Sequence, residues 1–317
     1  MDFFADIFEY RYLLNAVIAC ILSGITCGIV GTYIVARRMV FLSGGITHAS
    51  FGGLGIAFYA GINPLWGALA FAILSSLGIE YAGSSTKIRE DSAIGLMWGI
   101  GMAIGALFMS LKPGYTSGDL SSFLFGNIIS VTSEDVILLA ILTLALTVGA
   151  LLWLKPIMYL AFDRDFARSA GVKTKVAGYI MAVVIAVTIV LSIRVMGIVL
   201  LISLMTLPVV IANSVTKQYQ KITLWASVIA AICALLGVIV SYYLEVPSGP
   251  AIIFVLTLVL IIVKLFSLQP NKSLRTDENN RLTDTQVVPR TDGRYIFHRH
   301  LYSDDELRVA LYRGFGR

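Results

Sequence analysis

The sequence predicts an all-α bundle of about eight or nine membrane-spanning helices, followed by a short polar tail. Of its 317 residues, 57% are hydrophobic and 14% charged, and the mean hydropathy is +0.84. Soluble domains carry about 25% charged residues. The charges are unevenly spread, with 27 in residues 1–267 and 16 in residues 268–317. We therefore expect a transmembrane domain followed by a cytoplasmic tail. The composition excludes a nucleic-acid binder and a secreted disulfide scaffold.

Nine apolar runs are long enough to cross a bilayer, which requires about 20 helical residues. The runs are continuous rather than alternating, so they indicate helices. They lie at 13–36, 43–62, 65–84, 92–111, 134–154, 176–193, 195–214, 222–243 and 250–267. Only Asn63-Pro64 separates the second run from the third, and only Arg194 separates the sixth from the seventh. We expect tight hairpins at both places.

The basic residues predict which ends of the helices face the cytoplasm, because cytoplasmic loops retain Lys and Arg. Alternate connections are basic: they hold Arg37-Arg38, Lys87 and Arg89, five cations within 155–175, and Lys217 and Lys221, and the tail continues the series. Nine spans then place the N-terminus outside and the tail inside. The acidic N-terminal segment lacks the features of a cleavable signal, so we expect the first run to remain as a span.

The second run carries a lone histidine among glycines, in the segment Ser43-Gly-Gly-Ile-Thr-His-Ala-Ser-Phe-Gly-Gly-Leu-Gly55. His48 lies ten residues beyond Arg38, about 15 Å along a helix, near the bilayer middle. Ionisable groups at this depth usually face a pathway, and imidazole suits zinc and similar metals. We predict a pore-lining face that includes Gly44, Thr47 and Gly52. A histidine that only packs against another helix remains the alternative.

The seventh run contains a proline that removes a backbone donor within the span. Met205, Thr206 and Pro208 are therefore further candidates to line a pore, with a packed proline kink as the alternative. Before the fifth run, Thr132 begins a pattern typical of a helix N-cap. In the basic 160–176 loop, Asp163 is placed to cap a short helix and Gly171 to end it. Such a helix is a natural docking surface, although the loop could also be only a solvated connection.

The sequence has no Gly-x-x-x-x-Gly-Lys-Ser/Thr pattern, so we expect no ATP bound by a P-loop of this chain. Its spans also lack the paired Asp, the Ser and His pair and the His-Glu-x-x-His pattern that an intramembrane protease requires. If ATP drives this protein, another polypeptide hydrolyses it.

Five segments, in this order, resemble the membrane permeases of bacterial zinc, manganese and iron ABC importers, the ABC-3 metal permease family. They are Arg37-Arg-Met-Val-Phe-Leu with Thr47-His-Ala-Ser, Asp119-Leu-Ser-Ser-Phe-Leu-Phe-Gly126, Asp163-x-x-Phe-Ala-Arg-x-x-Gly171-Val, Val195-Met-Gly-Ile-Val-Leu-Leu-Ile-Ser-Leu-Met-Thr-Leu-Pro208, and Val246-Pro-Ser-Gly-Pro250. The resemblance covers about residues 11–267.

This resemblance implies a bundle similar to type II ABC importers, acting as a homodimer in the bacterial inner membrane. It implies a divalent metal ion as the transported substrate and no covalently bound cofactor. ATP would be bound and hydrolysed by separate cytoplasmic ABC ATPase subunits, so this chain would not be an enzyme. An extracytoplasmic metal-binding protein would deliver the ion. His48 becomes the favoured pore residue, and the ATPase-coupling loop comprises Asp163, Phe166, Ala167, Arg168 and Gly171.

The sequence departs from the family's pattern at two positions. Gly44 stands where the family usually has Asp, and Asn127 stands where it often has an acid. Imidazole without carboxylates is a softer site, so zinc is favoured, with manganese or iron as alternatives. Other function classes remain open. An ion-coupled secondary transporter would favour midplane acids and inverted repeats, and a membrane sensor would show no flux.

The tail lies outside the resemblance. Residues 268–293 read as a polar linker, and residues 294–314 as a small strand followed by a helix. His298 and His300 would share one face of that strand. A metal-sensing tail is one interpretation, and a docking segment or a tail without a specific role is the other.

Overall fold

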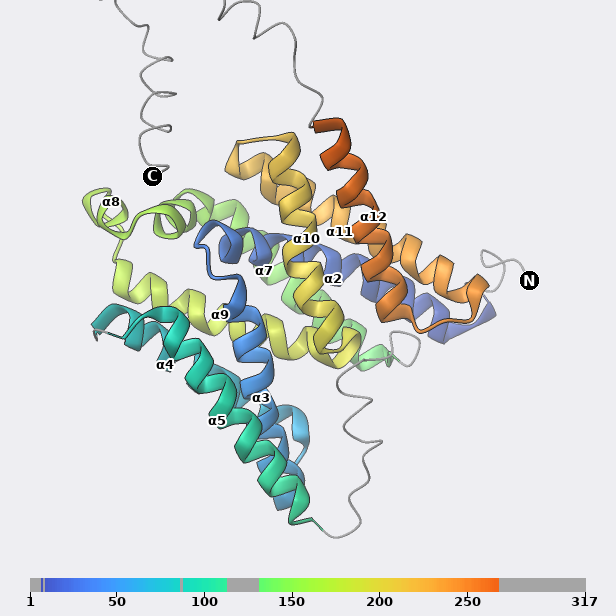
Figure 1. The fold of residues 1–317 in the computed structure, drawn as a ribbon, viewed down its shortest axis with the longest axis horizontal. Helices are drawn as coiled ribbons and strands as arrows, with labels where there is room; N and C mark the ends of the chain where they lie inside the picture. Colours follow the sequence, from blue (N-terminus) through green and yellow to red (C-terminus); the bar gives the residue numbers. More distant parts are fainter. Residues whose placement is uncertain (1–6, 8, 86–87, 113–130, 268–317) are drawn as a thin grey trace, which may run out of the picture. The chain divides into compact units, whose positions relative to one another are not determined.

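The structure, a computed structural model, describes residues 7, 9–85, 88–112 and 131–267 (Figure 1). Nine of the helices in these ranges are long and apolar enough to cross a membrane, and the short α8 is the exception. The helices are α2 (Arg11–Ala36), α3 (Val40–Ala60), α4 (Pro64–Ser85), α5 (Glu90–Ser110), α7 (Ser133–Phe162), α8 (Arg164–Ser169), α9 (Thr174–Met196), α10 (Ile198–Val215), α11 (Tyr219–Leu244) and α12 (Ser248–Ser267). The nine apolar runs are therefore confirmed as helices, and the protein is a multi-pass membrane helix bundle.

Two predicted boundaries were wrong. Arg194 does not separate two spans, because it lies inside α9. The break comes at Gly197, whose φ of 76° is easily adopted only without a side chain. The fifth span does not end near residue 154 either, because α7 continues to Phe162 across a kink at Trp153. Pro156 explains the kink, since its ring leaves no N–H for the preceding turn.

Helix α3 packs mainly against α4 and α5, with smaller contacts to α9 and α10 (Figure 1). Its close approach to α5 depends on small residues. A side chain on Gly101 of α5 would lie 2.5 Å from the Cα of Ala49, and one on Gly105 would overlap Phe51. Small-xxx-small faces allow such backbone contact. The neighbouring Gly95 and Gly99 have no atom within reach in this chain.

We expect Gly101→Val to lower the melting temperature of the purified protein. The added side chain would force α3 and α5 apart, and overpacking of this kind costs about 1–3 kcal/mol. Gly99→Val is the matched control, since it carries the same helix penalty into open space. Equal melting temperatures for the two variants would contradict the close α3–α5 contact.

The end of the bundle opposite α8 is fixed by an ion pair. The Nε of Arg194, in the last turn of α9, lies 2.8 Å from Oδ1 of Asp135 in the first turn of α7. The same carboxylate completes a capping box with Thr132, which confirms that residue as the N-cap of α7. This ion pair therefore joins the start of α7 to the end of α9.

Candidate functional site

His48 lies in the middle of α3 and is half-buried. Its ring stacks on the indole of Trp98 in α5, with ring centroids 4.3 Å apart and planes 8° from parallel. Its Nδ1 is buried and has no hydrogen-bond partner. Buried polar atoms are usually hydrogen-bonded, so an unsatisfied imidazole nitrogen at mid-span calls for an explanation beyond packing.

Gly44 lies one turn before His48 and faces α5 and α10. A side chain there would begin 3.6 Å from Cδ1 of Ile202 in α10 and 3.9 Å from Cζ3 of Trp98. These are ordinary contact distances, so the site has room for a side chain. Trp98 of α5 therefore neighbours both His48 and Gly44, and Ile202 of α10 lies beside Gly44.

The other pore candidates on α3 face inward in this chain. Thr47 is fully buried, and its Oγ1 has no partner. Gly52 lies against Gly101, where a side chain would meet the carbonyl oxygen at 2.9 Å. These contacts account for Gly52 as a packing residue within the chain. Its place on a pore remains a prediction.

The candidates on α10 differ in how deeply they are buried. Met205 is fully buried and its carbonyl group lies against Gly31 of α2, while Pro208 is also buried. Thr206 is half-buried and its hydroxyl donates to the carbonyl oxygen of Ile202 at 2.8 Å. Thr206 therefore lies one turn beyond the residue that faces Gly44, whereas Met205 and Pro208 contact the interior of the bundle.

The predicted coupling segment forms α8. Asp163 caps it, because its Oδ1 accepts hydrogen bonds from the backbone N–H groups of Asp165 (2.8 Å) and Phe166 (3.1 Å). The helix ends before Gly171, whose φ is 85°. The sequence-predicted cap and stop are thus confirmed.

Helix α8 presents two kinds of residue. Ala167 is fully buried and anchors the helix, whereas Phe166 is 54% exposed and rests edge-on against Tyr159. Arg168 is also exposed and pairs with Asp165 at 3.4 Å. An exposed aromatic ring beside a cation is typical of residues that anchor protein–protein interfaces.

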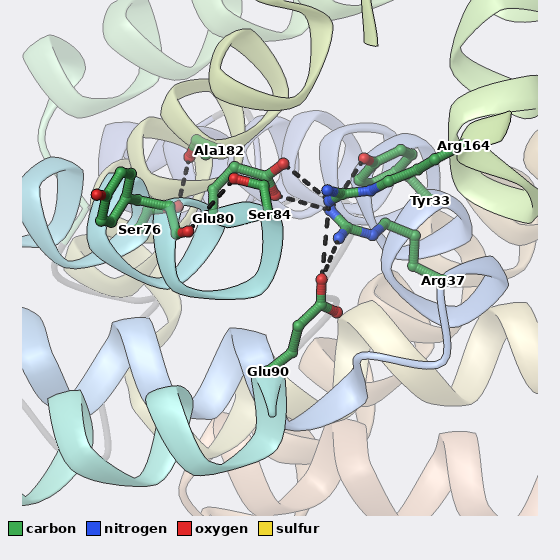
Figure 2. A network of polar contacts seen from close by, with 9 residues as sticks. Tyr33, Arg37, Ser76, Glu80, Ser84, Glu90, Arg164 and Ala182 are labelled. Atoms are coloured by element: carbon green, nitrogen blue, oxygen red, sulfur yellow. Dashed lines mark hydrogen bonds and ion pairs between the residues drawn. The ribbon is translucent and has the colours of Figure 1, made fainter. Parts of the chain in front are cut away.

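Four charged residues form an ion network where α8 meets the bundle (Figure 2). Arg37 follows α2, Glu80 lies in α4, Glu90 begins α5 and Arg164 begins α8. Nη1 of Arg37 lies 3.2 Å from Glu80 and its Nη2 lies 3.0 Å from Glu90. Nη2 of Arg164 lies 2.8 Å from Glu80 and 3.7 Å from Glu90. Each carboxylate therefore contacts both guanidinium groups.

The network is electrically balanced and is buried on one side only, because the side chains of Arg164 and Glu90 are 30% and 33% exposed. The side chains of Arg37 and Glu80 are 8% and 6% exposed. Burial alone would lower the pKa of Arg37, but Tyr33, Glu80 and Glu90 outweigh it and raise the pKa above its ordinary value. Arg37 also donates to the hydroxyl of Tyr33 at 3.3 Å. Its guanidinium is thus held charged.

Sequence reasoning missed Trp98 and this network. From the sequence, Arg37 was a marker of sidedness and part of a family motif, and Glu80 had no predicted role. An acid within an apolar run signals that a partner is needed, but the pattern does not name the partner. No comparable signal marks Trp98.

The described part of the chain contains no group of three or more His, Cys, Asp or Glu that could hold a metal ion. Among the described residues, His48 is thus not part of a group of three or more such ligands. The tail candidates His298 and His300, together with the proposed 268–293 linker and 294–314 element, lie outside the described residues. So do Asn127 and the 119–126 motif.

Comparison with known proteins agrees with this architecture. The pattern of the ABC 3 transport family matches residues 9–267. The manganese transport system membrane protein MntC of Listeria monocytogenes is 30% identical over 270 residues, covering 84% of this chain and 95% of that protein. A probable metal transport system membrane protein of Chlamydia muridarum is 37% identical over 246 residues, covering 76% and 84%. The solved structure of PsaBC from Streptococcus pneumoniae in complex with Fab has the same fold, with a TM-score of 0.75 at 24% identity over 87% of this chain and 99% of that one. This chain therefore belongs to the ABC 3 transport family.

Proposed function

We propose that this chain is the membrane-spanning subunit of an ATP-driven divalent-metal importer, and that zinc is its substrate. Two copies would form a homodimer with the pore between them, and alternating access would carry the ion past His48. The chain itself would not hydrolyse ATP. A cytoplasmic ABC ATPase pair would supply the energy, and an extracytoplasmic metal-binding protein would deliver the ion.

The observation that carries this proposal is the environment of His48. Its Nδ1 has no hydrogen-bond partner, and the neighbouring Gly44 and Trp98 have no side-chain atom that binds a metal ion. One imidazole per chain is too few ligands for a closed zinc site, which usually has four. Two copies would each contribute His48, which suits an ion that must bind and then leave.

Helix α8 supports the partner assignment. It is capped at both ends and exposes Phe166 at the loop that the basic residues place in the cytoplasm. By the same rule we propose that the N-terminus lies outside and the 268–317 tail inside, as a segment separate from the 1–267 transmembrane domain. We propose no transport role for His298 and His300 in that tail.

Manganese is the second candidate ion, because the Listeria relative is named as a manganese transport protein. Carboxylate and water oxygens suit manganese, whereas imidazole suits zinc. The absence of a carboxylate at residue 44 of this sequence therefore favours zinc.

We expect Gly44→Asp to shift the preference of the pore toward manganese. A side chain at this position begins at ordinary contact distances, so the variant should fold. The new carboxylate would lie one turn from His48 and add an oxygen ligand. Competition between radioactive zinc and manganese in the same vesicles measures the shift. An unchanged zinc-to-manganese ratio in a folded variant would argue against a metal path at this face.

Vesicle uptake tests the function as a whole. The chain is reconstituted with its ATPase partner, and metal uptake is followed with and without ATP. We expect uptake only when ATP and the partner are both present. Metal uptake that proceeds equally without ATP would contradict the proposal and favour a secondary transporter, and no uptake under any condition would favour a sensor.

A further inference from the structure

The ion network of Arg37, Glu80, Glu90 and Arg164 joins the proposed docking helix to the two helices that surround His48. Arg164 is the first residue of α8, and its guanidinium reaches Glu80 in α4. Arg37 lies between α2 and α3, and Glu90 is the first residue of α5. The network thus includes the first residue of α5 and lies three residues before the start of α3. His48 of α3 stacks on Trp98 of α5, about 12 Å further along each helix.

Two glycines provide the space for the two carboxylates. A side chain on Gly178 of α9 would overlap Oε1 of Glu80, and one on Gly83 of α4 would lie 2.6 Å from Oε1 of Glu90. Both glutamates therefore pack directly against glycine backbone, at the same oxygens, Oε1, that pair with Arg164 and Arg37. The neighbouring Ser76 of α4 also donates to the carbonyl oxygen of Ala182 in α9 at 2.8 Å, which fixes α4 against α9 beside Glu80 (Figure 2).

Stability alone is a weak reason for such a cluster. Replacing a buried ion network by packed apolar residues is often neutral or stabilising, whereas removing one partner is costly. A network of this kind instead links α8 to α4, α5 and the segment that precedes α3, since moving any of them apart breaks contacts between opposite charges. Coupling between distant sites is carried by such contiguous contacts and rigid helices.

We propose that Arg164 is a positioning residue that transmits movement of α8 through Glu80 to Arg37 and Glu90, and so to the α3–α5 pair at His48. This rests on the proposed function, in which an ATPase docks on α8. Arg164 itself contacts neither the ion nor the ATPase in this account. Its role is to keep α3 and α5 in a fixed position relative to α8.

The contacts also predict which conservative changes are tolerated. Arg164 makes both of its ion pairs through one nitrogen, Nη2. A lysine presents one point charge, so Arg164→Lys should retain most of the coupling. Arg37 uses Nη1 for Glu80 and Nη2 for Glu90, which requires the planar fork of arginine. Arg37→Lys should therefore not retain it.

The test measures the number of metal ions transported per ATP hydrolysed by the reconstituted complex. Arg164→Gln and Glu80→Gln should each lower this ratio on the order of tenfold, which is the usual scale of coupling between sites. Loss of folded protein lowers both rates together and leaves the ratio unchanged, so a purely structural role predicts no effect. Arg89→Gln is the control, because Arg89 lies beside Glu90 but is 84% exposed and pairs only loosely with Asp91.

The double variant provides the decisive comparison. If the two residues act as one linkage, Arg164→Gln combined with Glu80→Gln should be no worse than the more affected single variant. Two results would overturn the linkage. One is a wild-type number of metal ions transported per ATP in Arg164→Gln, and the other is a double variant whose loss is the product of the two single losses. Those results leave the proposed function intact, provided that the wild-type complex transports with ATP. Failure of the wild-type complex to transport would overturn the proposed function and the linkage together.

Discussion

His48→Ala is expected to reduce ATP-driven zinc uptake to background while leaving the protein folded and assembled. The substitution removes the only histidine in residues 1–267. It also breaks no hydrogen bond at Nδ1, because that atom has no partner. The stacking on Trp98 is worth about 1 kcal/mol, so the loss of stability should be small. Uptake into vesicles and the melting temperature of the same preparation measure the two effects.

Ser50→Ala is the matched control for this experiment. Ser50 lies in the same part of α3 and is fully buried, but its hydroxyl donates only to the carbonyl oxygen of Thr47 in its own helix, at 2.6 Å. We expect normal uptake in this variant. Normal uptake in an assembled His48→Ala protein would instead identify His48 as a packing residue, and the proposed pore would have to lie elsewhere.

Glu80→Ala is expected to cause the largest loss of stability of the substitutions considered. It leaves the buried Arg37 without one of its carboxylates and Arg164 without its 2.8 Å partner. Removing one member of a buried ion pair costs about 3–5 kcal/mol, which corresponds to a melting temperature lower by roughly 10 °C. Thermal unfolding of the purified protein in detergent measures the effect.

Asp91→Ala provides the comparison for Glu80→Ala. Asp91 is also an acid paired with an arginine at this end of the bundle, but the pair with Arg89 is 3.8 Å long and both side chains are largely exposed. Exposed pairs contribute about 0–1 kcal/mol, so the melting temperature should scarcely change. Equal effects of the two substitutions would mean that the network is not the buried cluster described above.

Local features of the structure followed from the sequence. Apolar length predicted the nine long helices, and residue type predicted the caps at Thr132 and Asp163 and the stop near Gly171. These features depend on residues within one or two turns of each other. The same reasoning misplaced the α9–α10 break, because hydropathy alone does not reveal the backbone geometry of Gly197.

Contacts between helices could not be predicted in this way. Arg37 pairs with Glu80 and Glu90 across sequence separations of 43 and 53 residues, and Arg164 pairs with Glu80 across 84 residues. Every span is apolar on most of its surface, so periodicity does not indicate which helices are neighbours. His48 was therefore identified from its chemistry, whereas its stacking on Trp98 and the ion network could be identified only from the three-dimensional structure.

Zinc accumulation in vesicles whose proton and sodium gradients are collapsed by ionophores distinguishes an ATP-driven permease from an ion-coupled transporter. The permease and its ATPase partner are reconstituted together, and the zinc concentration inside is compared with that outside. An ATP-driven permease should concentrate zinc as long as ATP is supplied, whatever the ion gradients. Accumulation that disappears with the ionophores and is indifferent to ATP would contradict the account.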